Sequence, residues 1–83
     1  MTIEELLCFI TDLDEMTHLL ETFLTLKELG ELENRLKILE MLSQGISQRQ
    51  IAHELGVGIA TVTRGAQAYK RHRVILDKYV SSS

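Results

Sequence analysis

Apolar side chains recur every three or four residues along most of the chain, and the alternation typical of β-strands is absent. The 83 residues include no proline, so long stretches can stay helical without interruption. This pattern predicts an all-α fold, a small helical domain that extends over residues 1–80. Residues 81–83 are three serines, for which we expect a disordered tail.

Three helices are predicted in the N-terminal half of the chain, at about residues 3–10, 13–24 and 25–44, each with an apolar face. Gly45 follows the third helix, where glycine commonly ends a helix. Gly30 lies within it, and we expect the first turn there either to fray or to approach another backbone closely. Capping-box pairs begin the first and third helices: Thr2 with Glu5 and Thr25 with Glu28. The stripe expected to face the core on the third helix consists of Leu29, Leu32, Leu36, Leu39 and Leu42.

These apolar faces are more extensive than a chain of this size can cover by itself. An internal disulfide is excluded because Cys8 is the only cysteine, and neither it nor the three histidines has the spacing of a zinc site. We therefore expect the helices within residues 3–45 to form the interface of a homodimer. Cys8 lies on an apolar face, which predicts a buried thiol that packs as a small hydrophobic group.

No segment has the features of a membrane span or of an export signal. The apolar runs are shorter than the roughly eighteen residues that a span requires, and residues 1–5 lack the basic region of a signal peptide. Together with the single thiol, these features predict a cytoplasmic protein.

Opposite charges are concentrated in the two halves of the chain, although the net charge at pH 7 is only −3. Residues 1–45 contain ten acidic and three basic residues, whereas residues 46–83 contain two acidic and six basic residues. A basic half beside an acidic half is typical of a protein that directs one face to a polyanion. Two solvated faces with an accidental asymmetry are the alternative interpretation of this pattern.

Residues 47–72 have the pattern of two short helices joined by a tight turn. Ser47 and Gln50 are placed to cap the first helix, and Gly56 suits a left-handed turn after it. The second helix is expected to begin at about Gly58. Plain packing of two helices would give a similar pattern, but the basic charge of this half of the chain and two further features together favour a DNA-binding helix-turn-helix.

The first feature is the spacing of Ala52, Gly56 and Val62, which places a small residue where the two helices would cross. The second is a small, polar start to the second helix. In a helix-turn-helix, the second helix enters the major groove while the first crosses the DNA backbone. The residues expected to be buried are Ile51, Leu55, Ile59 and Val62. Those expected to face a groove are Gln48, Arg49, Ala60, Thr61, Thr63 and Arg64.

The chain resembles the bacterial tryptophan repressor family over about residues 24–70, and residues 58–65 are the most specific part of this resemblance. The other matching segments are Leu24-Thr25, Asn34-Arg35, Glu40-Met41-Leu42, Gly45, Ser47-Gln48-Arg49 and Glu54-Leu55-Gly56. The resemblance implies an intertwined, all-helical homodimer. It also implies a transcriptional repressor that binds double-stranded operator DNA only when L-tryptophan is bound as corepressor.

The resemblance assigns roles to individual residues. Arg35 and Arg64 correspond to the two arginines that hold the indole ring between them, a role that suits a flat guanidinium group. Thr25 corresponds to a hydroxyl beside the ligand carboxylate, Leu24 to a carbonyl that faces the ligand amine, and Gly65 to a glycine that leaves room for the ring. The positions implied at the DNA interface are Gln48, Arg49, Gly58, Ile59, Ala60, Thr61 and Thr63.

Two positions depart from the family pattern. Ala68 replaces a serine that accepts a hydrogen bond from the ligand amine, so we expect weaker tryptophan binding than in a serine-bearing pocket. Ala52 replaces a lysine, which removes one expected phosphate contact. A regulator that is constitutive, or that responds to another small molecule, is therefore the alternative function.

Several side chains also have simpler structural explanations. Arg35 lies four residues after Glu31 and could form a surface salt bridge, whereas Arg64 could contact phosphate in place of a ligand. The three histidines show no partner pattern, and we expect them at the surface or packed. The basic residues near the C-terminus are either a phosphate-binding cluster or a solvated helix end: Lys70, Arg71 and Arg73.

An enzyme is not expected, because the sequence has no nucleophile–base pair, no glycine-rich phosphate loop and no paired carboxylates facing an apolar pocket. Besides the DNA-binding regulators, one other class of protein stays open. It is an interaction module whose apolar helices join a partner chain and whose helix pair is only structural.

Overall fold

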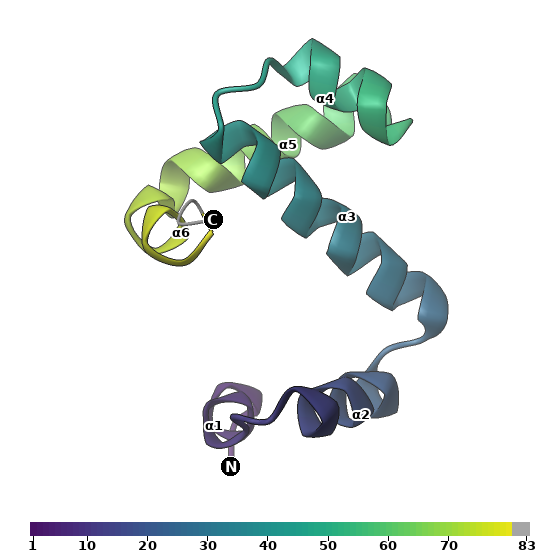
Figure 1. Ribbon diagram of the computed structural model, residues 1–83, viewed down its shortest axis with the longest axis vertical. Helices are drawn as coiled ribbons and strands as arrows, with labels where there is room; N and C mark the ends of the chain where they lie inside the picture. Colours follow the sequence, from purple (N-terminus) through teal and green to yellow (C-terminus); the bar gives the residue numbers. More distant parts are fainter. Residues whose placement is uncertain (81–83) are drawn as a thin grey trace. The chain divides into compact units, whose positions relative to one another are not determined.

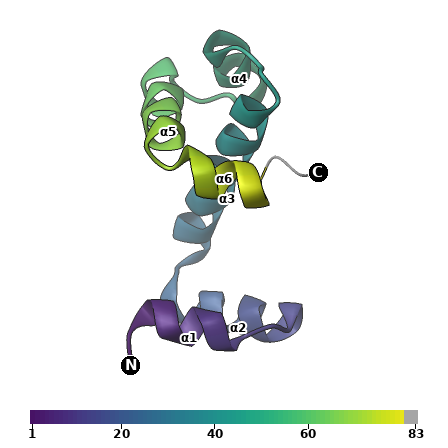
Figure 2. The same ribbon diagram turned by 90° about the vertical axis from the view of Figure 1, so that its left-hand side faces the viewer.

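The computed structural model describes residues 1–80 and confirms the predicted all-α fold, since this range consists of helices and contains no strand (Figures 1 and 2). The tail predicted at 81–83 lies outside the described residues. The chain divides into two compact units, Met1–Glu31 and a second that begins at Leu32. The helices are α1 (Ile3–Phe9), α2 (Leu13–Phe23), α3 (Leu26–Ser43), α4 (Gln48–Leu55), α5 (Ile59–Arg71) and α6 (Arg73–Tyr79).

Side-chain caps define where the helices of the N-terminal unit begin. The Thr2 hydroxyl accepts a hydrogen bond from the Glu5 backbone N–H at 3.1 Å, and the Glu5 carboxylate accepts one from Thr2 N–H at 3.1 Å. Thr25 and Glu28 form the same reciprocal pair at the start of α3, at 3.1 and 2.9 Å. Asp12 caps α2 through its carboxylate. Both predicted capping boxes are therefore confirmed.

The apolar faces of this unit are largely uncovered in the single chain. No residue of α1 or α2 is buried. Cys8 is exposed, so the prediction of a buried thiol is wrong for this chain. The large apolar side chains of α1 and α2 that are exposed are Ile3, Leu7, Phe9, Leu13 and Phe23.

The core of the C-terminal unit is formed by one residue from each of three helices. Ile38 of α3, Ile51 of α4 and Val62 of α5 are at most 1% exposed and pack together. Figure 1 shows α4 and α5 against the C-terminal part of α3. Ile51 and Val62 are buried as predicted, but Ile59 is 53% exposed and was wrongly expected in the core. Ile59 is the first residue of α5 and precedes Val62, the residue through which α5 contacts the core.

α3 is apolar on two sides, and only the C-terminal part of the predicted leucine stripe meets the rest of the C-terminal unit: Leu42 packs against the core, and Leu39 is half-buried. Ile38 is the one buried residue of this helix, whereas Leu32 and Leu36 are 46% and 47% exposed. Ile38 comes two residues after Leu36, so their side chains point to nearly opposite sides of the helix. The expectation that the stripe faces the core is therefore wrong for Leu32 and Leu36 in the single chain.

Glycines in the left-handed conformation end two of the helices. Gly45 follows α3 with φ of 79°, and Gly56 follows α4 with φ of 64°. Both positions confirm the predicted ends, because other residues adopt this conformation at a steric cost. Gly30 is different, since α3 is continuous through it and no atom lies within 4 Å of a Cβ placed there. The close approach expected at Gly30 is therefore absent from this chain.

α4 begins at the predicted cap, and only one of the two predicted contacts forms. The Ser47 hydroxyl accepts a hydrogen bond from the Gln50 backbone N–H at 3.2 Å. The Gln50 side chain does not return to the cap, because its amide donates to the Glu54 carboxylate one turn later, at 2.9 Å.

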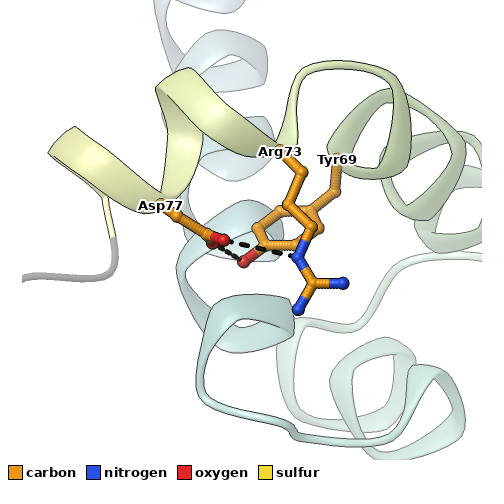
Figure 3. Close-up of polar contacts among 3 residues, drawn as sticks. All are labelled: Tyr69, Arg73 and Asp77. Carbon is orange, nitrogen blue, oxygen red and sulfur yellow. Dashed lines mark hydrogen bonds and ion pairs between the residues drawn. The ribbon is translucent and has the colours of Figure 1, made fainter.

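α6 is an additional helix that the sequence did not predict. It follows α5 after a single residue, His72, without a glycine or proline to mark the break. The Asp77 carboxylate accepts hydrogen bonds from the Tyr69 hydroxyl and from Arg73 Nε, the latter at 3.3 Å (Figure 3). Tyr69 belongs to α5, so this carboxylate holds α6 against the end of α5.

Candidate functional site

A pocket of about 310 Å³ lies between α3 and α5 in the C-terminal unit. Residues three and four apart on each helix share a face, which brings one side of α3 and one side of α5 to the same cavity. Its volume falls within the range of small-molecule sites, about 300–1,000 Å³. The lining residues are Arg35, Ile38, Leu39, Thr61, Arg64, Gly65 and Ala68.

The two helices approach each other most closely at Gly65. A Cβ placed on this residue would lie 2.7 Å from Ile38 Cγ2, closer than packed carbon atoms normally approach. Any side chain here would therefore push α5 away from α3 and alter the width of the pocket. The resemblance assigned Gly65 to ligand space, and the structure adds a packing reason for glycine at this position.

The pocket combines two positive charges with apolar walls. Arg35 and Arg64 are its only charged lining residues. Arg64 donates a hydrogen bond from Nη2 to the Thr61 hydroxyl at 3.4 Å, a long and therefore weak contact. Neither arginine forms an ion pair within residues 1–80, so the alternative of a salt bridge from Arg35 to Glu31 is not realised there. Such a pocket suits a flat ligand that carries a negative charge.

Two residues predicted to bind the ligand lie outside this pocket. Leu24 and Thr25 belong to the N-terminal unit, where Leu24 ends α2 and Thr25 caps α3. Neither is among the residues that line the pocket. Their roles in ligand binding stay predictions from the resemblance.

The first turns of α4 and α5 carry the residues predicted to meet DNA. Both turns are free of acidic residues, so the positive ends of the two helix dipoles are not neutralised there. Thr63 and Gln48 are joined by a hydrogen bond between the two helices, from the threonine hydroxyl to the amide oxygen, at 3.0 Å. The exposed residues in this set are Gln48, Arg49, Gly58, Ile59 and Ala60, and the half-buried ones are Thr61 and Thr63.

Sequence reasoning missed part of the pocket. Ile38 and Leu39 form its α3 wall together with Arg35, although neither was predicted to be near a ligand. Their spacing of three and four residues from Arg35 places them on the same helical face, and this signal could have found them. Thr61 was predicted at the DNA interface alone, and the structure places it in the pocket as well.

Neither a metal site nor a membrane-spanning helix is present in the described part of the chain. No group of three histidine, cysteine or acidic side chains lies close enough together to hold a metal ion between residues 1 and 80. In the same range, no helix combines the length and the apolar character needed to cross a membrane.

The fold and the pocket define a small helical protein with a cavity between α3 and α5, where α5 is the second of two helices joined by a short turn. The sequence profile of the family described as Trp repressor protein matches residues 2–80, and the chain belongs to this family. The family is named for a repressor and not for an enzyme.

Among its relatives, the chain is similar to proteins named Trp operon repressor homolog. It is 41% identical over 63 residues to that of Xylella fastidiosa strain M23, which covers 75% of this chain and 68% of the relative. Identity to the Vibrio parahaemolyticus protein is 44% over 69 residues, 82% of this chain and 67% of the relative. Identity to the Aliivibrio fischeri strain MJ11 protein is 47% over 55 residues, which covers 65% of this chain and 51% of the relative. No solved structure gives a significant match.

Proposed function

We propose that this protein is a homodimeric transcriptional repressor that acts in the cytoplasm and binds operator DNA through α4 and α5. L-tryptophan, or a close indole relative, is the proposed corepressor. One observation carries the proposal: Arg35 and Arg64 line a single pocket from two different helices, and Arg64 belongs to the helix proposed to enter the DNA groove.

DNA binding is supported by the arrangement of α4 and α5. The two helices pack through Ile51 and Val62 and are joined by a three-residue turn that contains Gly56. In the proposed complex, the first turn of α5 enters the major groove and α4 crosses the backbone. The absence of acidic residues from both first turns, together with the basic C-terminal half of the chain, favours contact with phosphate.

Gating by a ligand follows from the position of the pocket. A flat aromatic ring can stack on the guanidinium groups of Arg35 and Arg64, and their charge attracts a carboxylate. Four of the seven lining residues belong to α5, so a ligand wedged there sets the angle of this helix relative to α3. A ligand that favours the angle that fits DNA would raise the affinity for DNA by some factor. DNA must then raise the affinity for the ligand by the same factor.

Association of two copies is supported by the apolar surface of the single chain. Only three side chains are fully buried between residues 1 and 80, while large apolar residues remain exposed on α1, α2, α3 and α6. A homodimer would cover such faces. It would also hold two copies of α5 about 34–36 Å apart, the spacing of successive major grooves on one side of DNA.

A different effector is the alternative, and Ala68 is the observation that favours it. This residue lines the pocket with a methyl group, where the family pattern has a hydroxyl for the ligand amine. Because alanine offers no hydrogen bond to an amine, this position gives no preference for tryptophan over a ligand without an amine. It is equally compatible with a repressor that binds no ligand.

The deciding experiment is selection of bound sequences from random double-stranded DNA, followed by binding titrations with and without millimolar L-tryptophan. We expect a defined sequence to be enriched and its affinity to rise with tryptophan. Calorimetry with tryptophan alone measures the pocket separately. A protein that binds its selected sequence equally well with and without tryptophan would refute the gating and leave the DNA-binding function intact.

A further inference from the structure

We propose that Thr63 does not read the operator itself but positions Gln48, whose amide group then donates a hydrogen bond to a DNA phosphate. The proposal rests on the DNA-binding function proposed above. It divides the predicted DNA interface into residues that touch DNA and a residue that acts through a neighbour.

The observation is a single cross-link between the two helices. The Thr63 hydroxyl of α5 donates a hydrogen bond to Oε1 of Gln48 of α4, at 3.0 Å. It is the one side-chain to side-chain hydrogen bond that joins α4 to α5 within residues 1–80. The two residues are fifteen positions apart in the sequence, so the contact exists only when the helices are packed.

The number of hydrogen-bond donors on Thr63 and Gln48 determines which further hydrogen bonds each side chain can donate. A threonine hydroxyl has one proton, and Thr63 gives it to Gln48. Thr63 therefore has no free proton for the acceptor atoms that purines present in the major groove. The amide nitrogen of Gln48 keeps two donor hydrogens, and no partner for them exists in the described part of the chain.

The surroundings of Gln48 favour phosphate as the acceptor. Gln48 is exposed and is the first residue of α4, the helix that crosses the backbone in the proposed complex. Its neighbour Arg49 adds a positive charge, and the first turn contains no acid. Phosphate oxygens only accept hydrogen bonds, and amide side chains commonly donate to them.

The hydrogen bond from Thr63 would act by ordering the Gln48 side chain before DNA arrives. A glutamine that is free to rotate loses rotamer freedom when it binds, and this loss weakens affinity. Removing the hydroxyl should therefore weaken DNA binding about two- to tenfold, without a change in which sequence is preferred. Gln48 is neutral, so the salt dependence of binding should change little, in contrast to the loss of a charged phosphate contact.

A double-mutant cycle tests this inference in the full-length protein with its selected DNA sequence. Thr63→Val removes the hydroxyl at nearly constant shape, Thr63→Ser retains it, and Gln48→Ala removes the donor. We expect Thr63→Val and Gln48→Ala each to weaken binding, Thr63→Ser to bind nearly as the wild type does, and the double variant to bind no more weakly than Gln48→Ala. Losses that add, or a Thr63→Val loss confined to one base pair of the sequence, would overturn the proposal.

A second readout separates positioning from a general loss of structure. Single phosphates of the bound DNA are replaced in turn by neutral methylphosphonates. Replacement of one particular phosphate should lower the DNA affinity of the wild type. Gln48→Ala and Thr63→Val already bind more weakly, and the same replacement should lower their affinity little further. Arg49→Ala should keep the sensitivity at that phosphate.

Equal sensitivity of the wild type and both variants at every phosphate would show that Thr63 has only a structural role. Thermal unfolding of each variant shows whether it is folded at the assay temperature. A folded wild type that binds no DNA at all would overturn the proposed function and this inference together.

Discussion

Gly65 on α5 lies so close to Ile38 on α3 that even a methyl group on the glycine would meet Ile38 Cγ2 at 2.7 Å. Both residues also line the pocket between the two helices. The same contact therefore determines how near α5 lies to α3 and how wide the candidate ligand site is.

The first prediction concerns this contact. Gly65→Ala should destabilise the protein by about 1–3 kcal/mol, because the added methyl group overpacks the space against Ile38. Urea unfolding measures the change. Gly30→Ala is the matched control on α3, where no atom lies within 4 Å of the new methyl group, and it should stabilise by up to about 1 kcal/mol. Similar effects of the two substitutions would contradict the close contact.

The second prediction concerns the proposed DNA interface. Arg49→Ala should weaken operator binding by about 1–3 kcal/mol if its guanidinium contacts a guanine edge. If it contacts a phosphate, the substitution should weaken binding to all sequences alike. It should also make the slope of log K against log salt concentration shallower by about one. Titrations at several salt concentrations distinguish the two. Lys27→Ala removes the same charge outside the proposed interface, and an equal loss in that variant would mean that only net charge matters.

The third prediction concerns the pocket. Ala68→Ser should tighten L-tryptophan binding by about 1–3 kcal/mol, because the hydroxyl can accept a hydrogen bond from the ligand ammonium. Arg64→Ala should abolish binding, since it removes one of the two guanidinium groups. Calorimetry measures both. Ala66→Ser places the same hydroxyl on α5 outside the pocket lining and should leave the affinity unchanged. Tighter tryptophan binding in Ala66→Ser, or unchanged binding in Ala68→Ser, would argue against the proposed site.

The fourth prediction is a pH effect at the junction of α5 and α6. The hydrogen bond to Asp77 raises the pKa of the Tyr69 hydroxyl above its ordinary value of 10.0, because the phenol must keep its proton to donate. Since this pKa is higher in the folded than in the unfolded protein, the contact stabilises the fold below the unfolded pKa. The contribution is lost as the pH rises through the folded pKa.

Phenolate absorbance during an alkaline titration measures this ionisation. The background is Tyr79→Phe, in which Tyr69 is the only tyrosine. Asp77→Ala should bring the ionisation of Tyr69 back towards the ordinary pH. The same titration curve with and without Asp77 would be incompatible with the contact in Figure 3.

The fifth prediction is the oligomeric state. Light scattering should give a mass twice the 9.5 kDa of one chain at micromolar concentration. Leu36→Glu should dissociate the dimer, because Leu36 lies on the α3 face that is uncovered in the single chain. Lys37→Glu introduces the same side chain one residue further on and should leave the dimer intact. A stable, folded wild-type monomer would rule out the proposed assembly.

Features that depend on local chemistry were predicted well from the sequence. Thr25 begins α3 and Gly56 ends α4 because a cap or a left-handed glycine acts within one turn of its own position. The burial of Ile51 and Val62 followed in the same way from their spacing around that turn.

Features that depend on the choice between two surfaces were not predicted. α3 is apolar on two sides, and periodicity alone cannot tell that Ile38 rather than Leu36 meets α4 and α5. The exposure of Cys8 has the same origin, since an apolar face indicates burial without naming the element that covers it. The break before α6 has no punctuating residue, so His72 gave no signal.

Thr61 lies in the first turn of α5, where the DNA contacts are proposed, and it also lines the pocket. In an evolving lineage, a substitution of Thr61 that changes the effector would therefore tend to change the preferred operator as well. Arg35 and Leu39 carry no such double constraint, because they belong to α3. Effector preference should thus diverge between related repressors through α3 before it diverges through Thr61, which would change only together with the DNA that α5 is proposed to contact.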